Sequence, residues 1–376
     1  MNKTKSSIIH PYEVLIFDQN KLDNQNNRDK ENKDKKPSYL NREELSEVLE
    51  KIKKDKTKTI WINLIEANVS TFEPLLEVFE LHPLTVEDCT NEDQLPKIDF
   101  FPNYTFFIIN FFRSRGASVK ITEFDFIVGN NFLITAHKRP SSSSSSSEPI
   151  ENLIVDYSKL NFNSTSLAIT ADFLAYQLID QLNERKFTVI EKIQEEINLE
   201  EDWILKEERE GEKGRVGNKK IIAPEKLIKT RRKIIYIRKS IFHERELLYK
   251  ICRKDSPFIG ENMIYYYRNL YDQLFKFLEF TEILREEISS LLELYLSIKS
   301  NHLAEISNQT NQVVKKLTLF TTIFMPLTLI TGIGGMSEWS MMTSAFNWWY
   351  TYPLFILLLV FMGYGNYLWF KKKIWQ

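Results

Sequence analysis

The sequence predicts an α+β domain, with a mixed sheet and flanking helices, followed by a long stalk helix and two membrane-spanning helices. Three observations lead to this prediction. The first part of the chain alternates short strand-like and helical patterns, residues 261–325 contain neither Gly nor Pro, and the C-terminal part has two long uncharged stretches. We expect three domains: an α/β domain at 1–165, a helical region with the stalk at 166–316, and a two-helix membrane domain at 317–376.

The overall composition excludes several classes of protein. The chain has 376 residues, with 50 Lys and Arg against 51 Asp and Glu, so its formal net charge is −1. This balance argues against a nucleic-acid partner. Cys89 and Cys252 lie far apart without a Cys/His cluster, which does not support a disulfide framework or a zinc site. Because no P-loop, nucleophile elbow or kinase-like motif occurs in the sequence, we expect no enzymatic activity.

The N-terminal domain has the pattern of a central sheet with helices beside it. Helical spacing occurs at 42–54 and 72–79, and strand-like runs occur at 14–17, 59–64, 104–112, 120–128 and 131–137. Gly129 and Asn130 separate the last two runs, which predicts a hairpin. The polar run 20–37 and the serine run 141–147 are predicted to be surface insertions or linkers.

The middle of the chain is helical and strongly patterned in charge. Residues 169–210 become acidic toward their end, and a basic helix is predicted to begin at Pro224, which suggests an antiparallel hairpin of opposite charge. Residues 261–325 would form one helix of about 98 Å at 1.5 Å per residue. Its seam repeats every four and three residues, so it would pack against copies of itself or against neighbouring helices. The seam consists of Leu270, Leu274, Phe277, Thr281, Leu284, Ile288, Leu291, Tyr295 and Ile298.

Two membrane spans are predicted near the C-terminus. Between Lys316 and Lys371 the only charged residue is Glu338, and the segments 317–336 and 348–370 are each long enough to cross a bilayer. Lysines flank the pair on its outer ends, whereas the joining loop has no Lys or Arg. The positive-inside rule therefore predicts a multi-pass protein of the cell (inner) membrane with both termini in the cytoplasm.

One face of the first predicted span is polar. At 100° per residue, a single stripe holds Asn311, Val314, Thr318, Thr321, Met325, Thr328 and Gly332. Such a stripe suits either a pore wall or a helix–helix contact, because Thr and Gly are common where membrane helices pack. Two helices cannot enclose a pore, so a pore would need several subunits in a ring. The second span is almost purely apolar and is predicted to face lipid.

A set of short motifs covers most of the chain. They stand at 61–64 (WINL), 81–84 (LHPL), 87–88 (ED), 96–97 (PK), 133–137 (LITAH), 307–311 (SNQTN), 316–318 (KLT), 323–328 (IFMPLT) and 332–336 (GIGGM). Together these motifs resemble the CorA family of magnesium transport channels. The resemblance implies a homopentameric funnel of long stalk helices, with a pore lined by the first span and a short external loop.

The resemblance also implies a path for the ion. The family has a Gly-Met-Asn signature at the pore mouth, whose asparagine binds hydrated magnesium. This chain has Gly335-Met336-Ser337, with Glu338 as the only acid of the loop. A serine hydroxyl is shorter and a weaker dipole than an amide carbonyl, so affinity and selectivity are expected to differ. The implied path continues past Gly332, Thr328, Met325, Thr321, Thr318, Leu317, Val314 and Asn311, with Met325 and Leu317 as apolar constrictions.

Members of the family are gated by intracellular Mg²⁺ bound between neighbouring subunits. Glu87 and Asp88 match one half of that regulatory site, and Asn269 and Asp272 are assigned to the facing half. Asn269 is not an acid, which predicts weaker sensing. The predicted function is a passive Mg²⁺ channel driven by the membrane potential. The alternatives are a Co²⁺, Ni²⁺ or Zn²⁺ transporter of the same superfamily, or a non-conducting scaffold tethered to the membrane.

Overall fold

A computed structural model describes residues 12–18, 37–54, 57–65, 67–91, 94–115, 118–137, 169–211, 224–334 and 348–374. The chain divides into two compact units, Met1–Leu292 and Glu293–Gln376. The serine run at 141–147, and the polar run up to residue 36, lie outside the described residues. The domain boundaries at residues 165 and 316 stay predictions.

A seven-stranded mixed sheet forms the centre of the first unit, in the order β2-β1-β3-β7-β6-β5-β4. Among the strands that the structure describes, only β3 and β7 pair in parallel, and the other neighbours are antiparallel. The strands are β1 (Tyr12–Asp18), β2 (Ser38–Leu40), β3 (Lys58–Leu64), β4 (Ile98–Phe100), β5 (Thr105–Arg115), β6 (Ser118–Val128) and β7 (Phe132–Ala136).

The structure confirms the sheet that the sequence predicts, including the hairpin between β6 and β7. The N–H of Gly129 donates to the carbonyl of Phe132 (2.9 Å) at its turn. A Cβ on Gly129 would lie 2.1 Å from the Phe132 ring, so the turn requires glycine for space. The short strands β2 and β4 were not predicted from the sequence, because three residues are too few to show the alternation of a strand.

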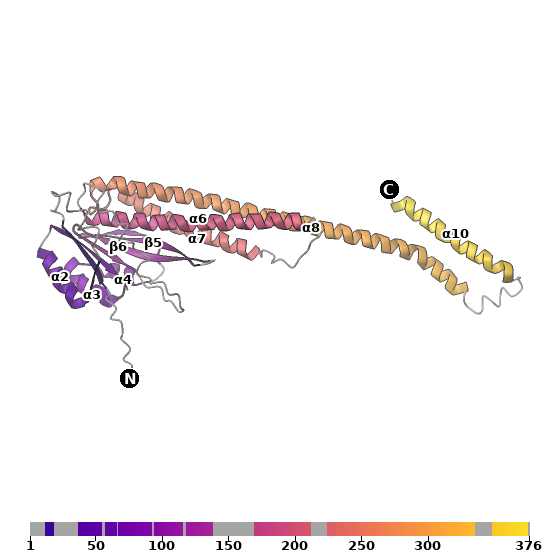
Figure 1. Cartoon of the computed structure of the whole chain (residues 1–376), viewed down its shortest axis with the longest axis horizontal. Helices are drawn as coiled ribbons and strands as arrows, with labels where there is room; N and C mark the ends of the chain where they lie inside the picture. The colour runs from indigo at the N-terminus through magenta and orange to yellow at the C-terminus, as the bar shows by residue number, and fades with distance from the viewer. Residues whose placement is uncertain are drawn as a thin grey trace, which may run out of the picture. The chain divides into compact units, whose positions relative to one another are not determined.

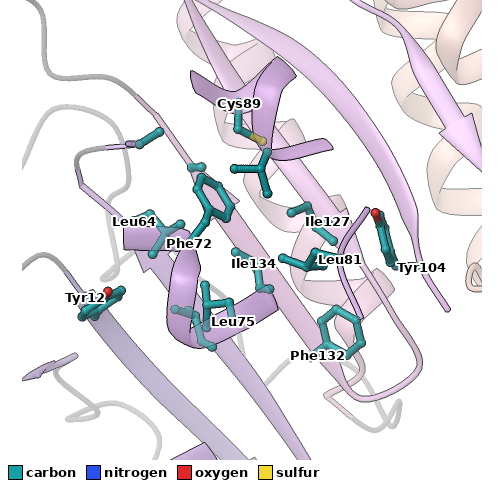
Figure 2. Packing of buried hydrophobic residues seen from close by; sticks show 14 of the residues in the cluster. Tyr12, Leu64, Phe72, Leu75, Leu81, Cys89, Tyr104, Ile127, Phe132 and Ile134 are labelled. Carbon is teal, nitrogen blue, oxygen red and sulfur yellow. The ribbon is translucent and has the colours of Figure 1, made fainter. Parts of the chain in front are cut away.

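Three helices cover one face of the sheet (Figure 1): α2 (Arg42–Lys54), α3 (Val69–Phe79) and α4 (Pro83–Thr90). Local sequence sets their starts. Asn68 caps α3 by accepting from the Thr71 N–H (3.0 Å), and α4 begins at Pro83, where a missing N–H costs nothing. Figure 2 shows Phe72 and Leu75 of α3 among strand residues such as Ile127 and Ile134.

Helices α6 (Ala171–Gly211) and α7 (Pro224–Cys252) lie against the other face of the sheet (Figure 1). They run antiparallel, as the charge pattern predicts. Lys233 Nζ lies 3.2 Å from a Glu196 carboxylate oxygen, and Lys226 pairs with Glu200 one to two turns further along. Opposite charges on the two helices therefore meet across the hairpin.

The stalk helix is α8 (Ile264–Gly334), preceded by the short 3₁₀ turn η3 (Glu261–Met263). The seam positions of α8 up to Tyr295 are buried or half-buried. Hydrogen bonds and ion pairs join the helix to α6 and α7: Asn183 donates to Gln273 (3.1 Å), and Arg238 pairs with Glu282 (3.0 Å). Of the two packing partners expected for the seam, the structure supports the neighbouring helices of the same chain.

In the second unit, the remainder of α8 and α10 (Trp348–Ile374) are the described elements. Two segments are long and apolar enough to cross a membrane, one within Glu261–Ile333 and the other Tyr352–Trp369, and neither is buried inside the chain. Both predicted spans therefore correspond to helices, and α8 continues past Pro326 without ending.

Candidate functional site

The C-terminal part of α8 places the predicted polar stripe on an open surface. Asn311, Thr318, Thr321 and Thr328 are all exposed, as are the apolar members of the stripe, including Met325 at 71%. At Gly332 no atom lies within 4 Å of the position that a Cβ would take. In this single chain nothing among the described residues covers the stripe. Val314 and Leu317 are likewise exposed, and Leu317 lies at the edge of the stripe.

The threonine hydroxyls of this segment have one orientation in common. Thr318 donates to the carbonyl of Val314 (2.8 Å), Thr321 to that of Leu317 (2.9 Å), and Thr328 to that of Phe324 (2.7 Å). Since each hydroxyl proton is used within the helix, the oxygen can only accept a further hydrogen bond. A row of acceptors suits the water shell of a cation, whose hydrogens point outward.

Helix α10 contacts the side of α8 away from the stripe. A Cβ on Gly363 of α10 would lie 3.4 Å from Leu327 Cδ1, and Gly363 is itself half-buried. The half-buried residues of α8 here include Leu319, Ile323 and Ile330, which lie roughly opposite the stripe at 100° per residue. This arrangement leaves the hydroxyl-bearing face free while the apolar helix covers the other.

The predicted pore-mouth residues Gly335, Met336, Ser337 and Glu338 lie outside the described residues. Their assignment as a selectivity site stays a prediction.

The predicted regulatory residues lie on two elements of the first unit. Asp88 of α4 is half-buried and forms an ion pair with Lys97, with Nζ 2.6 Å from Oδ2, whereas Glu87 is exposed. Asn269 and Asp272 are exposed on α8. Within the described parts of one chain, no group of three His, Cys, Asp or Glu side chains forms a metal site.

Two thiols and a histidine can be set aside as metal ligands. Burial, and then the neighbouring Asp125 carboxylate, raises the pKa of the Cys89 thiol well above its usual value, so Cys89 stays protonated. Burial also raises the pKa of Cys252. His82 caps α4, where its Nδ1 accepts from the Leu84 N–H (3.2 Å), so this side chain has a structural role.

Two charged pairs were missed from the sequence. Lys97 belongs to a motif in the sequence, yet nothing there indicated Asp88 as its partner. Lys186 and Glu244 form an ion pair in which both side chains are completely buried. For the second pair, the sequence does contain an indication that Lys186 is buried. Lys186 stands seven residues from both Ile179 and Ile193, so helical spacing places it on the same buried face of α6.

Comparison with known proteins agrees with this arrangement. The sequence profile of the family described as "CorA-like Mg2+ transporter protein" matches residues 56–372. The chain is 29% identical over 326 residues to the "Cobalt/magnesium transport protein CorA" of Thermotoga maritima, covering 86% of this chain and 85% of that protein.

Two solved structures share the fold. The complete structure of the CorA magnesium transporter from Methanocaldococcus jannaschii superposes with a TM-score of 0.59 at 18% identity, over 85% of this chain and 90% of that one. The full-length CmaX protein superposes with a TM-score of 0.54 at 16% identity, over 84% and 89%. With a family match over 56–372 and two exposed apolar helices, the chain belongs to the CorA-like Mg²⁺ transporter family, as a divergent membrane transporter of divalent metal ions and not an enzyme.

Proposed function

We propose that the protein is a passive homopentameric channel that admits Mg²⁺ through the cell membrane, with both termini in the cytoplasm. The main support for this proposal is the exposed stripe on α8. There the hydroxyl oxygens of Thr318, Thr321 and Thr328 can only accept a further hydrogen bond. A polar face on a membrane helix must be shielded from lipid. Five copies arranged with their stripes inward would enclose a wet path.

The membrane potential is sufficient as the driving force. Moving one charge through 100 mV contributes about 2.3 kcal/mol, so a divalent cation gains about 4.6 kcal/mol. No nucleotide-binding motif is needed for such uptake. The ion would enter at Gly335, Met336, Ser337 and Glu338 and pass the stripe to Asn311.

Proteoliposomes test this proposal directly. An inside-negative potential is imposed with a potassium gradient and an ionophore, and Mg²⁺ entry is followed with a trapped dye. We expect potential-dependent entry that Thr328→Val lowers about fivefold, the factor that corresponds to one lost hydrogen bond of about 1 kcal/mol. Thr331→Val is the matched control, because Thr331 is exposed on another face of α8 and donates to the Leu327 carbonyl (3.0 Å). Correctly assembled protein without divalent entry would contradict the proposal and favour a non-conducting scaffold.

A Co²⁺, Ni²⁺ or Zn²⁺ transporter is the second candidate, and Ser337 is the residue that favours it. Competition by each ion against Mg²⁺ entry separates the two. If Ser337→Asn sharply raises Mg²⁺ flux, then the native pore mouth has a relaxed or altered selectivity.

Regulation by cytoplasmic Mg²⁺ is also proposed, through Glu87 and Asp88 of one subunit and Asn269 and Asp272 of its neighbour. The Lys97 ammonium competes with a metal ion for Asp88, since it lies 2.6 Å from that carboxylate. Binding would therefore require displacement of Lys97 or sharing of the carboxylate oxygens.

A further inference from the structure

The sheet and the helices that cover it meet at a completely buried ion pair. Lys186 of α6 and Glu244 of α7 have no solvent-exposed surface and contact each other through Nζ and Oε2. Moving two charges out of water costs several kcal/mol per ion in proteins, and well-packed apolar residues often replace such a pair without loss of stability. Stability alone therefore does not account for this pair.

Hydrogen bonds connect the pair directly to β5 and, through Asn183, to α8. The Asn110 N–H on β5 donates to Glu244 Oε1 (3.2 Å), and the Ser240 hydroxyl donates to the same oxygen (3.3 Å). Lys186 Nζ also donates to Asn183 Oδ1 (3.2 Å), and Asn183 in turn donates to Gln273 Oε1 on α8 (3.1 Å). One polar network thus joins β5, α6, α7 and α8.

The surrounding sequence repeats every seven residues on both helices. On α6, Lys186 stands midway between Ile179 and Ile193, and all three are buried. On α7, Glu244 stands midway between Ile237 and Ile251, which are buried too. Each charge therefore has a buried isoleucine seven residues before it and another seven residues after it.

A shift of one heptad would slide α6 along α7 by about 10 Å. Lys186 would then lie level with Ile237 or Ile251 instead of Glu244. An unpaired charge buried against aliphatic side chains is strongly unfavourable. The ion pair therefore disfavours both neighbouring registers.

We propose that the Lys186–Glu244 pair sets the register of α6 against α7, and through Asn183 and Gln273 that of α8, so that these helices dock on the sheet in one position. The pair would have this role whichever ion is transported. It concerns a positioning role for the two residues.

The decisive variant replaces both charges, since a single replacement leaves one charge buried without a partner. In Lys186→Met/Glu244→Leu the apolar face becomes continuous. Spin labels are attached at Thr188→Cys on α6 and Lys229→Cys on α7, which are both exposed. Measured along the helix axes, the two labels are separated by about 13 residues, so sliding of one helix along the other changes the distance between them. Cys252→Ser removes the half-buried thiol, whereas Cys89 stays, because burial raises the pKa of its thiol. Labelled full-length chains are diluted with unlabelled ones.

We expect the parent to give one narrow distance distribution and the double variant to give an added population displaced by about 10 Å along the axis, with helical content retained. The control is Glu196→Gln/Lys233→Met, which removes the partly exposed pair between the same helices and should leave one population. A single narrow distribution in the double variant would overturn the proposal. An unfolded double variant would also overturn it, because the pair would then be needed for stability.

Discussion

At the scale of single residues, charge partners decide which side chains are available for binding. Asp88 is one of two acids assigned to the regulatory site, and its carboxylate lies 2.6 Å from the Lys97 ammonium. The Asp88 side chain is 17% exposed and that of Lys97 36%, so the pair is only partly screened by solvent. In the proposed regulatory site, Lys97 would therefore compete with a divalent cation for Asp88.

Lys97→Met should strengthen Mg²⁺ binding at Asp88, because the competing ammonium is removed. The concentration of Mg²⁺ that half-protects the detergent-solubilised protein against a protease should fall several-fold. Lys97→Arg keeps the ion pair and serves as the control. Equal Mg²⁺ dependence in the three proteins would show that Asp88 does not bind the ion.

Tyr267 makes the first unit sensitive to alkali. Its side chain is completely buried, its hydroxyl donates to the Asp172 carbonyl (3.0 Å), and burial followed by the Asp172 charge raises its pKa well above 10. A pKa raised in the folded state gives stability that is present below the unfolded value, about pH 10, and is lost as the pH rises further.

The melting temperature in detergent should therefore fall as the pH rises beyond about 10, and Tyr267→Phe should fall less steeply. At neutral pH the same variant should lose about 1 kcal/mol with its hydrogen bond. Tyr104, whose pKa burial also raises, remains in the variant, so part of the alkaline loss persists. Identical pH dependence of variant and parent would exclude Tyr267 as a contributor.

At the scale of elements, α8 changes character along its length. Leu284, Ile288 and Leu291 are buried, with between 1% and 4% of their surface exposed, whereas Leu303 is 66% exposed. The apolar seam ends at Ile298, and residues 300–318 are exposed. The same helix is thus a core element in one part and an open surface in another.

Ile288→Ala and Leu303→Ala remove similar side chains from these two parts. Ile288→Ala should destabilise the first unit by about 2–5 kcal/mol through the cavity that it leaves. Leu303→Ala should leave the melting temperature of that unit unchanged. Thermal unfolding followed by circular dichroism in detergent measures both, and an equal loss in the two variants would contradict this assignment.

At the scale of the whole molecule, the proposed pathway depends on assembly. Each chain offers two exposed apolar helices and one polar stripe, and two helices cannot surround an ion. In the proposed channel, copies of the chain would bury the stripe away from lipid.

Native mass measurement of the full-length protein in lipid nanodiscs should give five chains. A ring of another size would correct the number of subunits while leaving an enclosed path. Single or paired chains in nanodiscs and in mild detergent would contradict the channel proposal.

Much of the fold, and the polar stripe of the candidate site, follow from the sequence alone. Alternation, helical spacing, the charge reversal between α6 and α7, and the long uncharged stretches are local patterns, and each indicates its element without knowledge of the neighbours. The stripe from Asn311 to Gly332 was predictable for the same reason, since helical geometry alone places those residues on one face.

Only the tertiary structure decided which partners these patterns meet. Lys186 is buried beside Glu244 although 58 positions separate them, whereas Lys192 of α6 and Lys229 of α7 are exposed. The Lys97–Asp88 pair and the packing of the α8 seam on α6 and α7 were decided in the same way. Burial and charge pairing depend on residues that are distant along the chain, so helix and strand periods cannot specify them.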